Sequence, residues 1–401
     1  MSKIIAGLDI GNGYVKGSIY GDNLVAVDVP SCVAYVTNTH NLKEHDIDSV
    51  MSDIFNELDV SFESPLINDS YRRLFGIRGL QSGKAVEEFD VYSHISKAKQ
   101  PLTIMLTLGC LAGKVLQDYW NKHHKLPDTQ LKADVRIALA LPIGEFMKYR
   151  KTYAEGYKAS NHVVCIHNFE QVIKVEIHFE DVQVIAEGQA AQKAINAKGV
   201  QFMEAMLTEV RRMGEPLTGV KAEDILAVEN TVGVDIGEGT TNFPVYINGK
   251  FNPDASVTFN KGYGSVLNAA LERLQDLGYP FNSRKALQDY LNRPPVVNKD
   301  TYRIVQDIVD EEITAFVMDV SFQFANVMRK VGAYVEVVYV YGGGATPVRN
   351  ELYPALIDKA KSFAAGVLAY PILYLDSNFS RWLNQEGLYV IADSYAKASK
   401  Q

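Results

Sequence analysis

Two glycine-rich segments of the chain have the residue types and the spacing of a phosphate-binding site. Both contain Gly-x-Asp-Ile-Gly-x-Gly, once at residues 7–13 and again 226 positions later at residues 233–239. Glycines allow a backbone to approach a ligand closely and to adopt positive φ, and amide groups in such turns bind anions. One copy is most often an ordinary hairpin, but two copies predict an internal duplication with such a hairpin in each half.

Each segment also holds an aspartate, Asp9 or Asp235. A carboxylate repels phosphate, so its position beside a phosphate-binding turn makes sense when Mg²⁺ lies between the two. Magnesium keeps several waters and takes carboxylate and phosphate oxygens, so we expect both aspartates to act on it through water. Lys16, on the strand after the first turn, is either a point charge that neutralises phosphate or a solvated surface lysine.

Two further sites lie outside the hairpins. Residues 342–344 are three glycines directly after a β-branched strand, a pattern typical of a flat-ligand site, a helix N-terminus or a simple strand-to-helix turn. Glu187 follows the apolar run 182–186 and could hold a water in line with a γ-phosphate, since phosphoryl transfer to water needs little more than positioning and charge stabilisation. Taken alone, Glu187 would be a first-turn glutamate favoured by the helix dipole.

The elements that must position these residues alternate between strands and helices, which predicts an α/β architecture. Asn248-Gly249 predicts a hairpin turn. The periodicity predicts strands at residues 4–8, 14–19, 135–141, 163–166, 173–179, 182–185, 231–234 and 335–340, and helices at 102–123, 147–158, 187–197, 264–277, 284–292, 300–331, 351–365 and from 385 or 387 to about 398.

Composition excludes several classes of protein. With 47% hydrophobic and 22% charged residues, the chain is neither disordered nor of low complexity. The net charge of −8 disfavours direct binding to nucleic acid. Three scattered cysteines disfavour a zinc site and indicate buried thiols in a reducing cytoplasm. No run of about 18 apolar residues occurs, so we expect no membrane span.

Five motifs in the same order resemble those of the superfamily of actin, sugar kinases and heat-shock chaperones. Residues 9–16 and 235–242 are similar to its two phosphate motifs, and residues 341–345 are similar to its adenosine motif. Residues 186–191 and 385–392 are similar to its two connecting helices.

Within the superfamily, the chain most resembles ParM-type bacterial actin-like proteins. Residues 138–143, followed by a Tyr- and Lys-rich helix, and residues 384–388 are similar to that family. Glu187 stands where the family keeps its water-positioning carboxylate, whereas eukaryotic actin has glutamine there.

The resemblance implies an actin-like ATPase fold, in which two duplicated RNase H-like domains flank a nucleotide cleft. Domain I is then expected at residues 1–186 plus the C-terminal helix 386–401, with an inserted subdomain at about 32–95. Domain II is expected at 187–385, with an inserted subdomain at about 260–335. The first insertion helps explain why the phosphate motifs are 226 positions apart, a long separation for this group.

The resemblance also implies a function. ParM-type proteins bind ATP, and some bind GTP, with Mg²⁺; they form filaments that hydrolysis destabilises, and a DNA-bound adaptor links the filament to a plasmid. This implies an ATP or GTP hydrolase coupled to polymerisation, in the bacterial cytoplasm, whose partners are further copies of itself and an adaptor, without direct contact to nucleic acid or membrane.

Carried over by motif, the residues take three roles. Glu187 and Asp235 are the catalytic candidates, and Asp9 and Asp235 would organise Mg²⁺ through water. The nucleotide-binding candidates are Asp9, Gly11, Asn12, Gly13, Tyr14, Lys16, Gly237, Glu238, Gly239, Thr240, Thr241, Gly342, Gly343, Gly344 and Ala345.

Two alternatives stay open. A small-molecule, sugar-type kinase of the same fold needs a base for the substrate hydroxyl and a set of sugar-binding loops, and the sequence has no convincing version of either. A non-dynamic actin-like scaffold, with structural nucleotide binding, would be favoured by an amphipathic membrane-targeting helix at the C-terminus, but residues 396–401 are a short and weak match.

Overall fold

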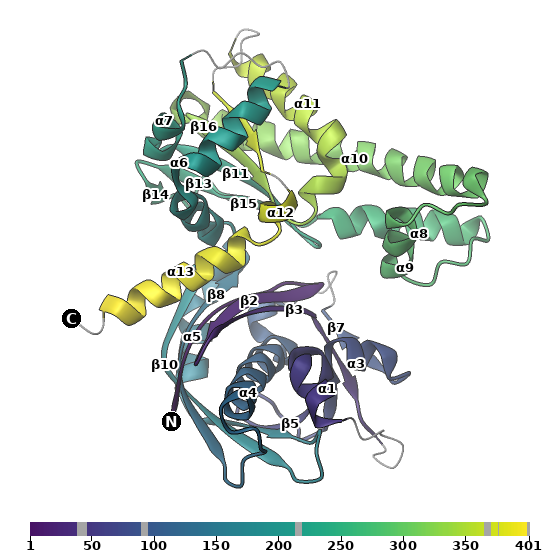
Figure 1. Cartoon of the computed structure of the whole chain (residues 1–401). Helices are drawn as coiled ribbons and strands as arrows, with labels where there is room; N and C mark the ends of the chain where they lie inside the picture. Colours follow the sequence, from purple (N-terminus) through teal and green to yellow (C-terminus); the bar gives the residue numbers. More distant parts are fainter. Residues whose placement is uncertain (38–45, 90–94, 213–218, 365–369, 376, 399–401) are drawn as a thin grey trace. The chain divides into compact units, whose positions relative to one another are not determined.

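The computed structural model describes residues 1–37, 46–89, 95–212, 219–364, 370–375 and 377–398. Its contacts divide the chain into two units, each with its own sheet (Figure 1). Unit 1 comprises residues 1–195 and 383–401, and unit 2 comprises residues 196–382. The domain boundaries expected from the sequence stay a prediction, and each unit is described here by itself.

The sheet of unit 1 begins with the first predicted hairpin. β1 (Ser2–Ile10) pairs antiparallel with β2 (Tyr14–Tyr20), which pairs antiparallel with β3 (Leu24–Pro30). On its other side β1 pairs parallel with β8 (Leu131–Leu141), which pairs parallel with β10 (Ile173–Ala186). Runs of apolar residues in these central strands suit a sheet that is covered on both faces.

The segment at 32–95, expected as an insertion, extends the same sheet. β9 (His162–Ile166) pairs with β10 on one side and with β5 (Asp59–Glu63) on the other. The order then continues through β6 (Arg73–Phe75), β4 (Cys32–Tyr35) and β7 (Val86–Glu88). The remaining elements of this segment are α1 (Ile47–Ser52), α2 (Ile54–Glu57) and α3 (Gly76–Gln81).

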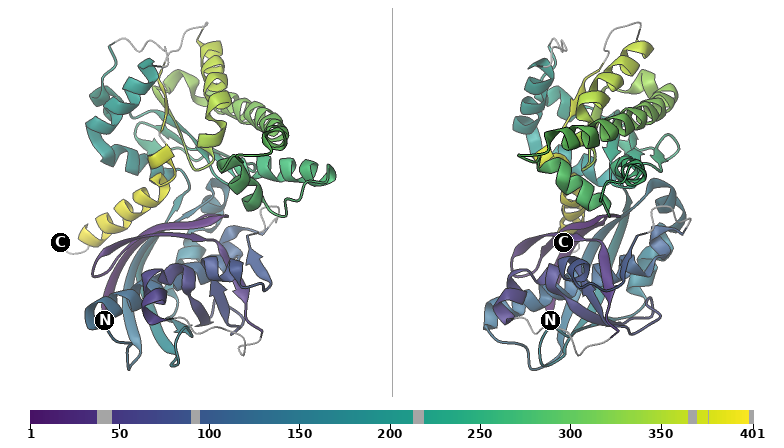
Figure 2. Two further views of the ribbon diagram at one scale, coloured as in Figure 1. Left: turned by 45° about the vertical axis from the view of Figure 1, so that its right-hand side comes forward. Right: turned by 90° about the vertical axis from the view of Figure 1, so that its right-hand side faces the viewer.

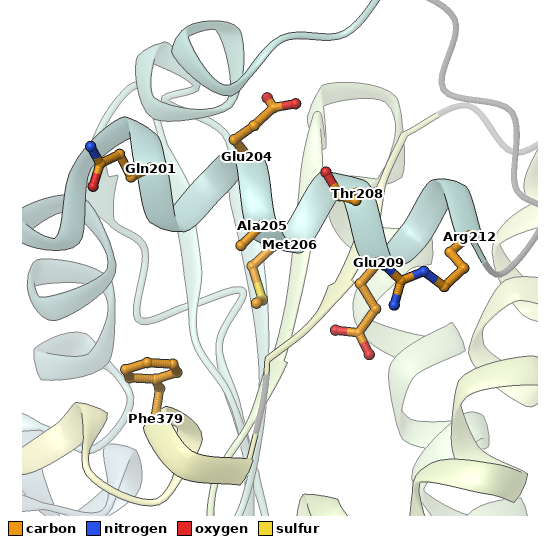
Figure 3. A pocket seen from close by; sticks show the side chains of 8 residues that line it. All are labelled: Gln201, Glu204, Ala205, Met206, Thr208, Glu209, Arg212 and Phe379. Atoms are coloured by element: carbon orange, nitrogen blue, oxygen red, sulfur yellow. The ribbon is translucent and has the colours of Figure 1, made fainter.

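Helices cover both faces of this sheet (Figures 1 and 2). α13 (Leu383–Ala398) packs on one face, where a Cβ on Gly7 would overlap the backbone of Tyr389. Ala6 and Leu8 point to the opposite face because side chains alternate along a strand, and α4 (Pro101–His123) lies there. The 3₁₀ turn η1 (Lys97–Lys99) precedes α4, and α5 (Ile143–Lys158) packs on β10.

Unit 2 repeats the arrangement around β11 (Thr231–Ile236). β11 pairs antiparallel with β12 (Thr241–Phe243) and β13 (Val245–Ile247), and parallel with β16 (Val337–Tyr341). β12 and β13 are separated at Pro244, which has no N–H to continue a ladder. The outer strands are β14 (Lys250–Phe251), β15 (Val257–Phe259) and β17 (Ile372–Tyr374).

The two sheets therefore share one plan: an antiparallel hairpin on one side of a central strand and two parallel strands on the other. In unit 1 the central strand is β1 and in unit 2 it is β11. The predicted α/β class and the predicted duplication are confirmed. The Asn248-Gly249 turn is also confirmed, since both residues have positive φ, at 51° and 69°, between β13 and β14.

Helices in unit 2 lie on both sides of its sheet. Figure 1 shows α6 and α7 on one side and α10 and α11 on the other. The core contains apolar residues of β11, β16, α8, α10 and α11. The helices are α6 (Gln189–Arg212), α7 (Ala222–Ala227), α8 (Tyr263–Asp276), α9 (Arg284–Asn292), α10 (Lys299–Val331), η2 (Gly332–Tyr334), α11 (Ala345–Phe363) and α12 (Ser377–Ser380).

Some predicted elements have different bounds. The strands predicted at 173–179 and 182–185 form one strand, β10, with a register shift between Phe179 and Asp181, because a bulge breaks the alternation without ending the strand. The helix predicted at 187–197 starts at Gln189 and continues to Arg212 through a kink at Gly199. The helix predicted at 351–365 begins earlier, at Ala345.

Two expectations from composition are tested by the described residues. Cys32, Cys110 and Cys165 are all buried and free, as predicted. Within those residues, no helix is long and apolar enough to cross a membrane.

Candidate functional site

The first glycine-rich segment forms the tight turn between β1 and β2. Asp9 pairs across the hairpin with Lys16, and the N–H of Gly11 donates to the carbonyl of Tyr14 at 3.0 Å. We expected the glycines of this turn to adopt positive φ or to allow close approach of another group. Gly11 does not have positive φ. Close approach explains this glycine instead, because a Cβ on Gly11 would lie 2.6 Å from the Tyr14 oxygen.

The second segment makes the same turn in unit 2. The N–H of Gly237 donates to the carbonyl of Thr240 at 2.8 Å, and Asp235 pairs across the hairpin with Asn242. Asn242 thus occupies the place that Lys16 has in unit 1. Thr241, next to the turn, donates its hydroxyl to the carbonyl of Lys261 at 2.8 Å. In both units the same backbone hydrogen bond closes the turn, and the aspartate lies at the same position before it. The duplication therefore extends to the geometry of the turn.

The carbonyl groups of the first turn are held by Ser31. Its hydroxyl donates to the Gly11 oxygen at 2.6 Å and its N–H to the Gly13 oxygen at 3.0 Å. In a trans peptide, a carbonyl and the N–H of the next residue point in opposite directions. The amide of Asn12 therefore points away from Ser31, to the side on which an anion would be bound.

The carbonyl groups of the second turn are held by the start of α8. The N–H of Tyr263 donates to the Gly237 oxygen at 3.0 Å, and the N–H of Gly264 donates to the Glu238 oxygen at 2.8 Å. Because a carbonyl and the next N–H point in opposite directions in a trans peptide, the amides of Glu238 and Gly239 point away from α8. Both turns thus present amide groups on one side, as anion-binding turns do.

The three glycines after β16 pack against this second turn. Gly342 has φ of +99°, and a Cβ there would overlap the backbone of Ile236 and lie 2.6 Å from Oδ1 of Asp235. The N–H of Gly344 donates to the Ile236 oxygen at 2.8 Å, and Ala345 starts α11. Gly342 and Gly344 are buried against protein, whereas Gly343 is exposed.

Two more glycines, which sequence reasoning did not assign to the site, complete the packing in unit 2. A Cβ on Gly262 would lie 2.5 Å from the Gly237 oxygen, and one on Gly264 would lie 2.7 Å from the Glu238 oxygen. The Glu238 carboxylate is held by Arg284 of α9 at 3.0 Å. The signal was available, because Gly-x-Gly at the start of a helix indicates close approach of another backbone.

Glu187 lies in unit 1, in the turn between β10 and α6. Its N–H donates to the Leu141 carbonyl at 2.8 Å, which continues the pairing of β10 with β8. Gly188, with φ of +82°, then turns the chain into the helix that starts at Gln189. The sequence context suggested that Glu187 is a residue of the first helical turn. In the structure it lies before the helix, and its position is set by the end of strand β10.

Charged groups of unit 1 converge on Asp9. Burial raises the pKa of its carboxyl, Lys97 lowers it, Glu187 raises it and Lys16 lowers it, in that order of size, and the net direction is upward. Burial disfavours the charged form of a carboxyl group, and a nearby cation stabilises that form. Unit 1 thus brings together Asp9, Lys16 and Glu187, and it adds Lys97.

Lys97 is the charged residue that sequence reasoning missed. It belongs to the short turn η1, and its Nζ lies 3.3 Å from Oε1 of Glu187. Ninety positions separate the two residues, and no motif includes Lys97. Only the tertiary structure identifies this ion pair.

The site residues lie in two groups. Asp9, residues 11–14, Lys16 and Glu187 belong to unit 1, whereas residues 235–241 and 342–345 belong to unit 2. Each group lies at the hairpin of the central strand and at the end of a parallel strand in its own sheet. Two such groups, one in each half of a duplicated α/β chain, are what the resemblance to actin-like proteins led us to expect.

Comparison with known proteins agrees with this class. Residues 7–189 match the family described as the N-terminal domain of actin-like proteins. No curated protein sequence matches the chain. The chain has the actin-like fold that its motifs predicted.

Solved structures of ParM and Alp7A are similar over nearly the whole chain. Apo pSK41 ParM is 19% identical with a TM-score of 0.57, and 100% of this chain and 99% of that chain are covered. ParM of Bacillus thuringiensis with ATP is 15% identical with a TM-score of 0.58, and 99% of each chain is covered. The actin-like protein Alp7A is 15% identical with a TM-score of 0.65, covering 99% of this chain and 98% of its own.

Substitution of Gly342 tests the packing of the glycines against the second turn. Gly342→Ala is expected to lower the free energy of unfolding by about 2–5 kcal/mol, because it adds left-handed strain to an overpacked contact. Gly343→Ala is the matched control, since Gly343 is exposed and lacks positive φ. Denaturant unfolding of the nucleotide-free variants measures the difference, and equal stabilities would contradict the packing described here.

Proposed function

We propose that this protein is a nucleotide-dependent, filament-forming actin-like ATPase that segregates plasmid DNA through a DNA-bound adaptor. One observation carries the proposal: the same turn, with the same hydrogen bond and a preceding aspartate, recurs in both units. In each unit, a turn with outward amides suits a phosphate group. The ParM proteins with ATP and with AMPPNP support this choice of ligand, because they share the fold.

The proposed roles follow from position. The amides of Asn12, Glu238 and Gly239 hold phosphate oxygens, and Lys16 adds a positive charge. Residues 342–345 lie beside the nucleoside, with Gly343 as the glycine that remains exposed. Glu187 orients the attacking water, because its carboxylate lies near Asp9 and its backbone is held between a strand and a helix.

Magnesium fits the carboxylates of this chain. In the part of the chain that the structure describes, no group of three or more His, Cys, Asp or Glu side chains could hold a metal ion. Asp9 and Asp235 would each act on Mg²⁺ through water, since Mg²⁺ usually keeps several waters beside carboxylate and phosphate oxygens. When bound, Mg²⁺ would neutralise charge on the phosphates.

Assembly and partners are proposed from the resemblance. One similar structure is a non-polymerisable quadruple mutant of pCBH ParM, 14% identical with a TM-score of 0.62. The net charge of −8 favours leaving DNA contact to an adaptor. We place this activity in the bacterial cytoplasm.

The first experiment is right-angle light scattering after addition of Mg-ATP, Mg-GTP or buffer to the purified protein, with phosphate release measured in parallel. The expected result is a rise with nucleotide that decays as phosphate appears. Scattering that stays flat across a wide protein concentration range would contradict filament formation. Transfer of phosphate to a member of a sugar panel would support the kinase alternative instead.

A second experiment tests the role in plasmid segregation. Deleting the coding sequence from its plasmid is expected to reduce retention of that plasmid without selection, and supplying the wild-type protein should restore it. Equal retention with and without the protein would contradict segregation as its function, whatever the result of light scattering.

A further inference from the structure

An ion pair between Lys97 and Glu187 lies deep in unit 1. Nζ of Lys97 is 3.3 Å from Oε1 of Glu187, and the two side chains are only 7% and 13% exposed. Exposed ion pairs contribute little because water screens them and the side chains stay mobile. This pair is largely removed from water, so its geometry is held more firmly than that of a surface pair.

The backbone beside Lys97 is fixed by one carboxylate. Glu145, in the first turn of α5, accepts the N–H of Lys97 at 3.0 Å, the N–H of Ala98 at 3.2 Å and the hydroxyl of Ser96 at 2.7 Å. On the other side, the carbonyl of Lys97 accepts the hydroxyl of Thr103 in α4 at 2.8 Å. Three donors on one carboxylate hold η1 in place between two helices.

The ammonium also acts on a second carboxylate. Lys97 is the strongest of the charges that lower the pKa of Asp9, whereas Glu187 raises it. Asp9 and Glu187 repel each other, and a cation near both reduces that repulsion. The charge of Lys97 thus acts on both carboxylates, but its direct contact is with Glu187.

We propose that Lys97 is a positioning residue for Glu187, and that Glu145 acts through Lys97 in the same role. The inference rests on the proposed function, because it assigns Glu187 to the attacking water. Lys97 holds the Glu187 carboxylate in one orientation before nucleotide arrives, so that a water can be placed without rearrangement. Misplacement of a positioned group by about 1 Å lowers a rate on the order of 100-fold.

Steady-state kinetics of three variants tests the role of Lys97. Lys97→Met is expected to lower kcat by about 10- to 100-fold with nucleotide affinity within about threefold of wild type, because misplacing Glu187 affects the chemical step. Lys97→Arg should recover part of kcat. Lys99→Met is the matched control, because Lys99 lies in the same turn but is exposed.

The inference is overturned if Lys97→Met keeps a wild-type kcat, or if it loses nucleotide affinity as much as kcat. It is also overturned if Lys99→Met loses as much activity as Lys97→Met. Glu145→Gln provides a second variant that keeps the ammonium: kcat should fall, though less than in Lys97→Met. A wild-type kcat in Glu145→Gln would remove Glu145 from the proposal.

A double-mutant cycle tests the ion pair without any nucleotide. Thermal unfolding of Lys97→Met, Glu187→Gln and the double variant is expected to be non-additive, because residues in contact share one interaction. Additive shifts would overturn the pairing. If wild type binds nucleotide but does not hydrolyse it, the proposed function fails, while this cycle still decides whether Lys97 positions Glu187.

Discussion

Glu187→Ala is expected to slow phosphate release by about 100- to 10,000-fold while nucleotide binding and assembly persist. The carboxylate is the group proposed to orient water, whereas the carbonyl groups of the two turns are held by Ser31 and by the start of α8. The Glu187 backbone is held by the Leu141 carbonyl, so removal of the side chain leaves the strand end intact. Filaments that cannot hydrolyse their nucleotide should persist, so the scattering signal should rise and not decay.

Glu180→Gln is the matched control for Glu187→Ala. Glu180 lies on the same strand, β10, and also pairs with a cation, Arg136, at 2.8 Å, but it is far along the strand from the turn. Phosphate release by Glu180→Gln should equal that of wild type. Hydrolysis that continues at the wild-type rate in Glu187→Ala would remove Glu187 from the mechanism.

Asp235→Asn is expected to abolish the use of Mg²⁺-nucleotide, with hydrolysis reduced at least as strongly as in Glu187→Ala. Asp235 is only 4% exposed and lies between Asn242 of β12 and Tyr341 of β16. Replacing a buried carboxylate with an amide of the same shape removes the charge that would hold Mg²⁺. Because the amide has the same shape as the carboxylate, the packing around residue 235 is kept, so the nucleotide-free protein should stay close to wild-type stability.

Two measurements separate these effects of Asp235→Asn. Isothermal titration of Mg-ATP should show weakened binding or lost magnesium dependence, and thermal unfolding without nucleotide should show no loss of stability. Asp254→Asn, in an exposed loop of the same unit, is the control. A variant that hydrolyses normally would contradict the proposed role of Asp235 toward Mg²⁺, and one that merely unfolds would make Asp235 a structural residue.

Much of the fold was predictable because the two hairpins carry local signals. Asp9 and Asp235 each lie one residue before the end of an apolar strand, and the turn that follows has a glycine that permits close approach. The turn therefore follows from residues that are adjacent in sequence. The strand before Gly342 and the periodicity of α4 are signals of the same kind. Local patterns also explain why one strand was predicted as two. The bulge in β10 interrupts the alternation of apolar residues, and this interruption was interpreted as the end of a strand.

The partners of the glycines and of Glu187 were not predictable, because their contacts join distant parts of the chain. Gly342 is a glycine because the backbone of Ile236, 106 positions earlier, fills the space where a Cβ would lie. Gly262 and Gly264 pack on the carbonyls of the second turn for the same reason. From the sequence alone, each of these glycines would be interpreted as an ordinary turn residue.

The sequence by itself determined the α/β class, the duplication and the two turns with their aspartates, since each depends on neighbouring residues and on a repeat at a fixed offset. Only the tertiary structure decided which carbonyl groups Ser31 and α8 hold, and therefore which way the turn amides point. It also decided that Lys97 pairs with Glu187. The physical reason is that hydrogen bonds and buried ion pairs depend on distance in space, and a sequence records only order along the chain.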